Sequence, residues 1–227
     1  MRNSSEAQTF ATPAPITVVL DIPAGRVQFV AADRPDTAVE VRPTDPAKGR
    51  DATAAELTAV AYADGVLRIT TAATGNQLLA RSGSIEVTVQ LPAGSRVEGR
   101  AAAAELRAVG RLGEVAFAGA YRQIKIDEAA SLRLTAVDGD VEVGRLAGPA
   151  EITTARGHIR IAEAARGRVE LTTQFGEITV AAASGVPAVL DARAQHGRIT
   201  NLLKNDGTPG LDIHAATTHG DITARSL

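Results

Sequence analysis

The chain has 227 residues, a formal net charge of −2 and no cysteine. That length accommodates one large or two small domains with a buried core. The 24 basic and 26 acidic residues are mixed along the chain, which gives no support for nucleic-acid binding. The absence of cysteine excludes disulfides, thiolate catalysis and Cys-ligated metal sites.

The hydrophobic content is 44%, but aromatic residues make up only 3%. The interior must therefore be filled by Val, Ile, Leu and Ala, which favours thin, regular layers over a bulky globular centre.

Residues 1–13 form a polar N-terminus that we expect to be disordered. They lack the apolar centre of a secretory signal, and no stretch of the chain approaches the ~18 apolar residues of a membrane-spanning helix. We therefore expect a cytoplasmic protein that does not insert into a membrane.

Residues 14–95 are expected to form a β-rich N-terminal cap. Runs rich in β-branched residues are separated by Pro, Gly and Asp, which predicts strands at Ile16–Ile22, Arg26–Ala31, Ala38–Arg42, Leu57–Tyr62, Val66–Thr71 and Ser84–Leu91. The segment Pro43–Ala55 is expected to be a loop with a short helical turn. Two segments, 20–29 and 89–98, share a strand, the tripeptide Pro-Ala-Gly and a second strand.

Residues 96–227 contain a repeat. The phrases GDVEV, GHIRI, GEITV, GRITN and GDITA begin at Gly139, Gly157, Gly176, Gly197 and Gly220. Two degenerate members place Ala104 and Arg122 at the glycine position, and successive spacings are 18, 17, 18, 19, 21 and 23 residues.

The positions around each anchor alternate in polarity. With the anchor as zero, positions −7, −5, +2 and +4 of seven repeats give 28 residues, none of them charged. The intervening positions −6, −4, +1 and +3 hold 16 charged residues among 28. This period of two, kept in register over seven repeats, predicts two short strands per repeat with one buried face.

Repeats of 17–23 residues are too short for a βαβ crossover or a helical repeat pair. We therefore predict an all-β fold, a single-stranded parallel β-helix or β-solenoid of about seven two-strand coils over residues 96–227. The N-terminal cap would pack on this stack or continue it. The five anchor glycines are predicted to be structural corners at which a Cβ atom would clash.

The two strand–Pro-Ala-Gly–strand units and the serial G-[DEHR]-[IV]-x-[IV] phrases resemble the bacterial putative-adhesin family of β-strand-repeat domains, a family of unknown function. The resemblance covers about residues 14 to 225. It implies a β-helical domain with no established catalytic residues, and the adhesin label implies surface display.

No phosphate loop, nucleophile elbow, dinucleotide fingerprint or calcium-binding nonapeptide is present, so we expect no cofactor and no enzyme activity. His196 and His219 precede anchor glycines, and with Asp221 they are weak candidates for metal ligands. An exposed corner is the alternative interpretation of both histidines. Asp138, Asp140 and Glu177 could serve in acid–base chemistry, but they also fit an ordinary charge ladder.

The leading hypothesis is a non-catalytic scaffold or protein-interaction module that self-associates through an uncapped C-terminal coil. The alternative is a surface adhesin or carbohydrate-binding domain. A third hypothesis is a metal-dependent or polysaccharide-active enzyme. The uncapped C-terminal coil and the loop at 202–210 are the expected locations of function.

Overall fold

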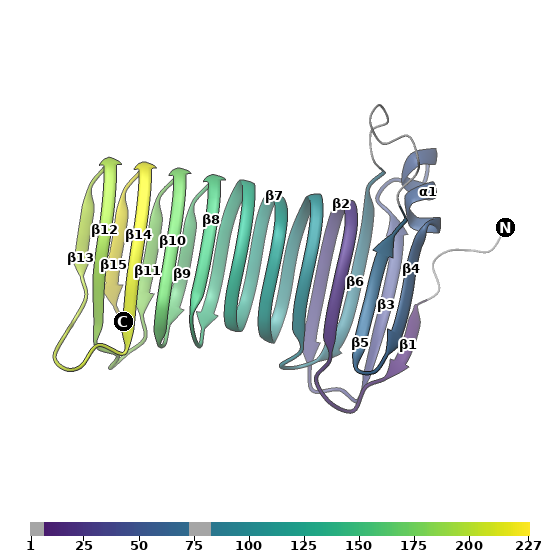
Figure 1. The fold of residues 1–227 in the computed structure, drawn as a ribbon, viewed down its shortest axis with the longest axis horizontal. Helices are drawn as coiled ribbons and strands as arrows, with labels where there is room; N and C mark the ends of the chain where they lie inside the picture. Colours follow the sequence, from purple (N-terminus) through teal and green to yellow (C-terminus); the bar gives the residue numbers. More distant parts are fainter. Residues whose placement is uncertain (1–6, 73–82) are drawn as a thin grey trace.

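Strands run side by side along the whole length of the molecule in a computed structural model (Figure 1). The structure describes residues 7–72 and 83–227, and the strands of these segments form one 15-stranded sheet. The all-β prediction is confirmed.

The N-terminal part contributes six strands and a short helix to this sheet. These are β1 (Gln8–Ala11), β2 (Thr17–Ala32), β3 (Asp36–Pro43), α1 (Gly49–Glu56), β4 (Thr58–Ala63), β5 (Val66–Thr71) and β6 (Ile85–Pro92). The helical turn lies close to where it was expected. β1 lies in the segment expected to be a disordered polar tail, of which residues 1–6 fall outside the described residues. The Phe10 ring packs 5.5 Å from the Tyr62 ring, centroid to centroid.

The C-terminal part contributes nine strands. These are β7 (Arg96–Leu146), β8 (Ala150–Arg156), β9 (Ile159–Ala164), β10 (Gly167–Phe175), β11 (Ile178–Ala182), β12 (Ala188–His196), β13 (Ile199–Leu202), β14 (Leu211–His219) and β15 (Ile222–Ser226). Strands β8, β10, β14 and β12 pair in parallel on one side of the molecule. Strands β9, β11, β15 and β13 do so on the other.

The predicted single-stranded parallel β-helix or β-solenoid of sequential coils is wrong in three respects. The sheet is mixed, because β1–β3, β3–β6 and β4–β5 pair antiparallel. Residues Arg96–Leu146 form one unbroken 51-residue β element, which turns at corners such as Arg122 and Gly139 (Figure 1), rather than separate pairs of strands. The strands at the far end do not follow chain order, since the sheet runs β10-β14-β12.

The last two repeats have exchanged places. Strands β14 and β15, which come last in the sequence, lie between β10 and β12 and between β11 and β13. The terminal repeat of the stack is therefore β12 with β13, hereafter the end repeat. Residues 203–210 carry the chain back across the end repeat, which explains why this loop is longer than the other connections from β7 to β15.

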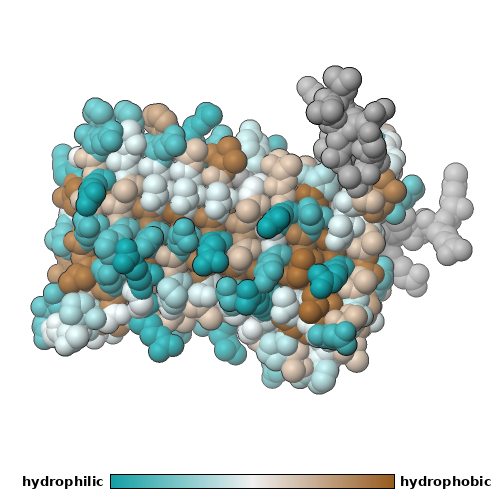
Figure 2. Space-filling model, in the orientation of Figure 1, coloured by the Kyte–Doolittle hydropathy of each residue, from teal (hydrophilic) through white to brown (hydrophobic). Residues whose placement is uncertain are grey.

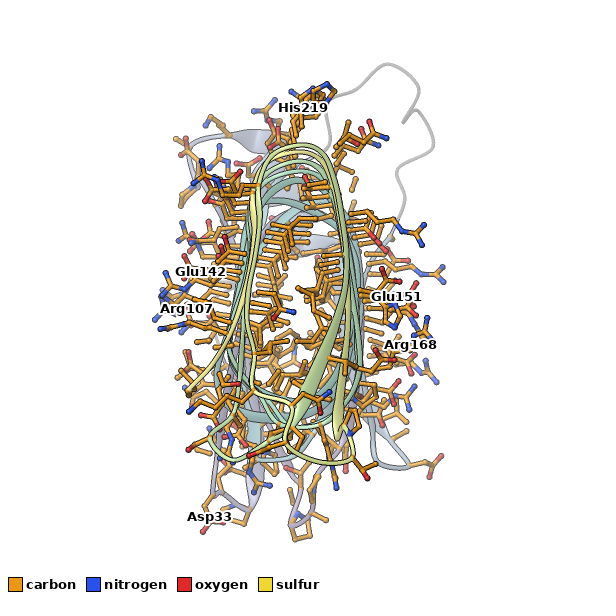
Figure 3. The ribbon with its side chains drawn as sticks, turned by 90° about the vertical axis from the view of Figure 1, so that its left-hand side faces the viewer. Asp33, Arg107, Glu142, Glu151, Arg168 and His219 are labelled. Carbon is orange, nitrogen blue, oxygen red and sulfur yellow. The ribbon has the colours of Figure 1, made fainter. Side chains whose placement is uncertain are left out.

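Aliphatic side chains fill the space between the two sides, as the view along the molecule shows (Figure 3). The predicted inward positions are buried in the inner repeats; Ile152, Ile159 and Ile213 are each 0% exposed. In the end repeat the same positions are open, and Ile199 is 43% exposed. Alternation predicted the buried face correctly, and the exceptions follow from the exchanged order.

The anchor glycines lie at the corners because no Cβ fits there. A Cβ on any of the five would come within 1.5–2.1 Å of a backbone carbonyl oxygen in the adjacent repeat. At Gly157 that oxygen belongs to Gly139, and φ is +131°. Arg122 occupies the corner of an earlier repeat with a φ of +95°, a conformation that is unfavourable for a residue with a side chain.

Buried threonines complete these corners, and sequence analysis did not identify them. The Thr173 hydroxyl donates a hydrogen bond to the Gly157 carbonyl (3.1 Å), and Thr217 donates to the Gly176 carbonyl (3.0 Å). Both side chains come from the position three residues before an anchor. They satisfy the carbonyl oxygen that crowds the next glycine.

Candidate functional site

One outer side of the molecule carries a row of charged side chains across neighbouring strands. Alternation along β8, β10, β14 and β12 points one residue of each strand outward at the same level. The parallel register places them in the order Glu151, Glu170, His214, Asp191, about 4.8 Å apart at the normal strand spacing. We call this side the polar face (Figure 2), along the middle of which hydrophilic side chains gather.

Arginines pair with the carboxylates of the polar face. Arg133 Nε lies 3.4 Å from Glu151 Oε2, and Arg168 pairs with Glu170 on its own strand. These side chains are 46–70% exposed, so each pair contributes only about 0–1 kcal/mol to stability.

His214 lies between two carboxylates. Its Nε2 is 3.0 Å from Asp212 Oδ2 on the same strand, and its Nδ1 is 3.6 Å from Asp191 Oδ2 on β12. The Nε2 contact is close but not aligned as a hydrogen bond, so this buried nitrogen has no hydrogen-bond partner. His214 and Asp191 both line a depression.

Two shallow depressions join on the polar face. The first, about 260 Å³, is lined by Arg168, Glu170, Asp191, Arg193 and His214, with Leu171, Thr172, Ala215 and Ala216 beneath. The second, about 380 Å³, shares Arg168 and Glu170 and extends to Arg133, Glu151 and Glu114. Together they form a trough that crosses β8, β10, β14 and β12, with guanidinium and carboxylate groups along it.

The opposite side also carries ion pairs, but a smaller depression. Figure 3 shows Glu142 and Arg107 projecting from one side and Glu151 and Arg168 from the other. Lys125 Nζ lies 3.3 Å from Glu142 Oε2, beside a depression of about 200 Å³. This side provides a natural control for experiments on the polar face.

The histidines singled out for metal binding lie in a stack of rings at the corner. The His219 ring lies between those of Phe175 and His196, with centroid distances of 4.9 and 4.7 Å and interplanar angles of 10° and 7°. Lone pairs on nitrogens lie in the ring plane, so stacked imidazoles direct them side by side rather than toward one ion. Among the described residues, no group of three His, Cys, Asp or Glu side chains could hold a metal.

The third metal candidate has a structural contact. Asp221 Oδ1 accepts a hydrogen bond from the backbone N–H of Arg198, at 2.8 Å. The same arrangement occurs where Asp140 Oδ1 accepts from the N–H of His158 (2.8 Å) and His158 Nδ1 accepts from the N–H of Glu177 (3.0 Å). This corner ladder engages both Asp140 and Asp221, which were candidates for chemistry, in backbone hydrogen bonds.

Sequence analysis did not identify the trough. A stack in chain order would set Asp191 beside Glu170, whereas the exchange of the last repeats inserts His214 between them. Arg168 and Asp212 gave no separate signal, because outward charges occur in every repeat.

No protein-family model matches the sequence, and no curated protein matches it. Solved structures do match. A putative adhesin from Bacteroides fragilis is 15% identical with a TM-score of 0.51, and the match covers 96% of each chain. A putative lipid binding protein from Parabacteroides distasonis is 12% identical with a TM-score of 0.50, over 98% of this chain and 97% of that one.

A putative cell adhesion protein from Clostridium sporogenes matches 98% of this chain and 100% of its own, at 10% identity and a TM-score of 0.47. The match to the Bacteroides fragilis putative adhesin confirms the resemblance inferred from the sequence, and at 15% identity this resemblance concerns the fold alone. In the segments 7–72 and 83–227, no helix has both the length and the apolar character needed to cross a membrane.

Proposed function

We propose that this chain is a non-catalytic, adhesin-type module that binds a carbohydrate along the trough of the polar face. The observation that carries the proposal is the trough itself, in which Arg168 and Glu170 join two depressions into one polar surface. Of the three functions considered from the sequence, an adhesin or carbohydrate-binding domain has more support than a scaffold alone. Two solved structures with this fold are a putative adhesin and a putative lipid binding protein.

The chemistry of the trough suits polyhydroxylated ligands. Carboxylates accept hydrogen bonds from hydroxyl groups, and guanidinium groups donate them in a planar fork. Because the row repeats at the strand spacing, a polymer could be held at successive positions. The depressions lie at or below the lower end of the usual range for small-molecule pockets, ~300–1,000 Å³, which favours contact along an extended chain over enclosure of a small molecule.

The proposal is tested by glycan-array screening followed by calorimetry on the best ligand. The double variant Glu170→Gln, His214→Ala should weaken binding about tenfold or more, because it removes a charged acceptor and an imidazole that lines the trough. The control, Glu142→Gln, alters a similar carboxylate on the opposite side and should leave binding unchanged.

Binding that is equally sensitive to both variants, or no binding to any glycan, would reject the proposal. The ligand recovered after incubation should be chemically intact; any depolymerisation would favour the enzyme hypothesis instead. Adhesion implies exposure at the cell surface, and fractionation of the native cells tests this.

A further inference from the structure

The end repeat leaves one end of the stack open. In the described part of the chain, β12 pairs with β14 alone and β13 with β15 alone. Ile199 and Leu202 are 43% and 63% exposed, whereas Ile222 at the position equivalent to Ile199 in the neighbouring repeat is 0% exposed. Figure 3 is viewed onto this end.

The open end presents backbone donors. In inner repeats, the N–H of the anchor glycine and of the residue two positions later donate to carbonyls of the adjacent repeat; Gly220 donates to His196 (3.0 Å) and Ile222 to Arg198 (2.9 Å). The N–H groups of Gly197 and Ile199 are equivalent by register, so they point out of the stack. Such an edge is a template for another strand.

The side chains of the edge do not block pairing. Native edges are often protected by inward-pointing charges or proline. The inward positions of the end repeat are instead uncharged: Ala188, Leu190, Ala192, Ala194, Ile199 and Asn201. Nine residues of β12 are available to a partner strand.

The outward side chains of β12 are complementary to themselves. Asp191 and Arg193 flank Ala192, and their own Oδ2–Nη2 distance is 4.0 Å with Arg193 84% exposed. If a second β12 runs antiparallel about a twofold axis at Ala192, each Asp191 faces Arg193 of the other copy. Opposite charges directly across two strands favour that register, and both pairs form at once because the interface is symmetric.

A head-to-tail stack fits less well. At the other end of the sheet the edge strand β1 has only four residues. The hydrogen bonds of the corner ladder also end at this repeat. Arg198 is equivalent to Asp221 but has no acceptor atom in its side chain, so it cannot accept a hydrogen bond from a further repeat.

We infer that the protein forms a twofold dimer in which the β12 edges of two copies pair antiparallel about Ala192. The dimer is independent of the carbohydrate proposal, because its test uses no ligand. Two polar faces would then be presented by one particle, which strengthens attachment to a polymer that can reach both.

The test is size-exclusion chromatography with light scattering on the full chain over a wide range of concentration. The wild type should dimerise, and Arg193→Glu should raise the dissociation constant about tenfold or more, because like charges then face each other. The swap Asp191→Arg, Arg193→Asp should restore the dimer. Arg133→Glu, in the same row but far from the edge, should leave it intact.

A wild-type protein that is monomeric at all concentrations would overturn the inference, and so would a swap variant that stays monomeric. The register has a second test, since the chain lacks cysteine. Under oxidation Ala192→Cys should give a covalent dimer and Val189→Cys should not, because the twofold brings residue 192 against itself. Equal cross-linking of both variants would contradict the stated register.

Discussion

A glycine-to-alanine substitution at a corner adds one methyl group and tests whether the adjacent repeat leaves room for a Cβ atom. We expect Gly157→Ala to be strongly destabilising, since its Cβ would lie 2.1 Å from the Gly139 carbonyl oxygen at a φ of +131°. Gly185→Ala is the matched control: its φ is +74°, and nothing lies within 4 Å of the added Cβ. Both variants incur the backbone penalty, but only the first incurs the clash.

The magnitudes follow from these two terms. A left-handed conformation costs a residue with a side chain about 1–2 kcal/mol, which is the whole expected effect at Gly185. At Gly157 the adjacent repeats must also separate, at about 1–3 kcal/mol for overpacking. The hydrogen bonds at this corner, Gly157 N–H to Phe175 O (2.9 Å) and Thr173 Oγ1 to Gly157 O (3.1 Å), would weaken at about 1 kcal/mol each. A total of about 4–7 kcal/mol is expected.

The assay is urea unfolding followed by far-ultraviolet circular dichroism, because the chain has no tryptophan to report on its core. A loss at Gly157 that is at least about 2 kcal/mol larger than at Gly185 is the expected result. Equal losses at the two sites would refute the reasoning, since the carbonyl of the adjacent repeat would then play no part.

Three further outcomes are expected. Arg122→Gly should raise the free energy of unfolding by roughly 1 kcal/mol, because it relieves a positive φ; a lower melting temperature would contradict this. Thr173→Val should cost about 1–3 kcal/mol by leaving a buried carbonyl unsatisfied, whereas Thr172→Val, on the outward side, should cost little by the same thermal melt. A hydrogen bond from Arg34 lowers the pKa of Asp36 below 3.8, so Asp36 favours the folded state above its unfolded pKa, and this contribution is lost as the pH falls through the folded pKa. NMR titration should show that Arg34→Met raises the pKa of Asp36. An unchanged pKa would show that the hydrogen bond from Arg34 does not lower it.

The inward and outward positions could be predicted from sequence because a period of two assigns each side chain to a face. The same pattern could not predict the order of the last two repeats. Exchanging them leaves every inward residue inward. Leu190 and Ile213 occupy equivalent inward positions, and either aliphatic side chain can fill that place in the core. Two features of the sequence indicate the exchange. One is the long loop at 202–210. The other is Arg198, which follows its anchor glycine where the other glycine-anchored repeats have a hydrogen-bond acceptor.

Because the order of the last two repeats could not be predicted, the candidate site could not be predicted either. His214 contacts Asp191 in either order, but only the exchanged order also brings it beside Glu170. The mixed N-terminal sheet could not be predicted from the alternation of polar and apolar residues, because alternation does not specify whether neighbouring strands run parallel or antiparallel.

The exchange of the last two repeats underlies both the trough and the open end, and cysteine pairs test it directly. Thr172 is in register with Ala216, and Ala216 with Arg193, so the first pair is one strand apart (~4.8 Å) and Thr172 and Arg193 are two strands apart (~9.6 Å). In a chain without cysteine, Thr172→Cys with Ala216→Cys should form an intramolecular disulfide, and Thr172→Cys with Arg193→Cys should not. A disulfide in the second pair alone would show that the repeats stack in chain order and would contradict the account.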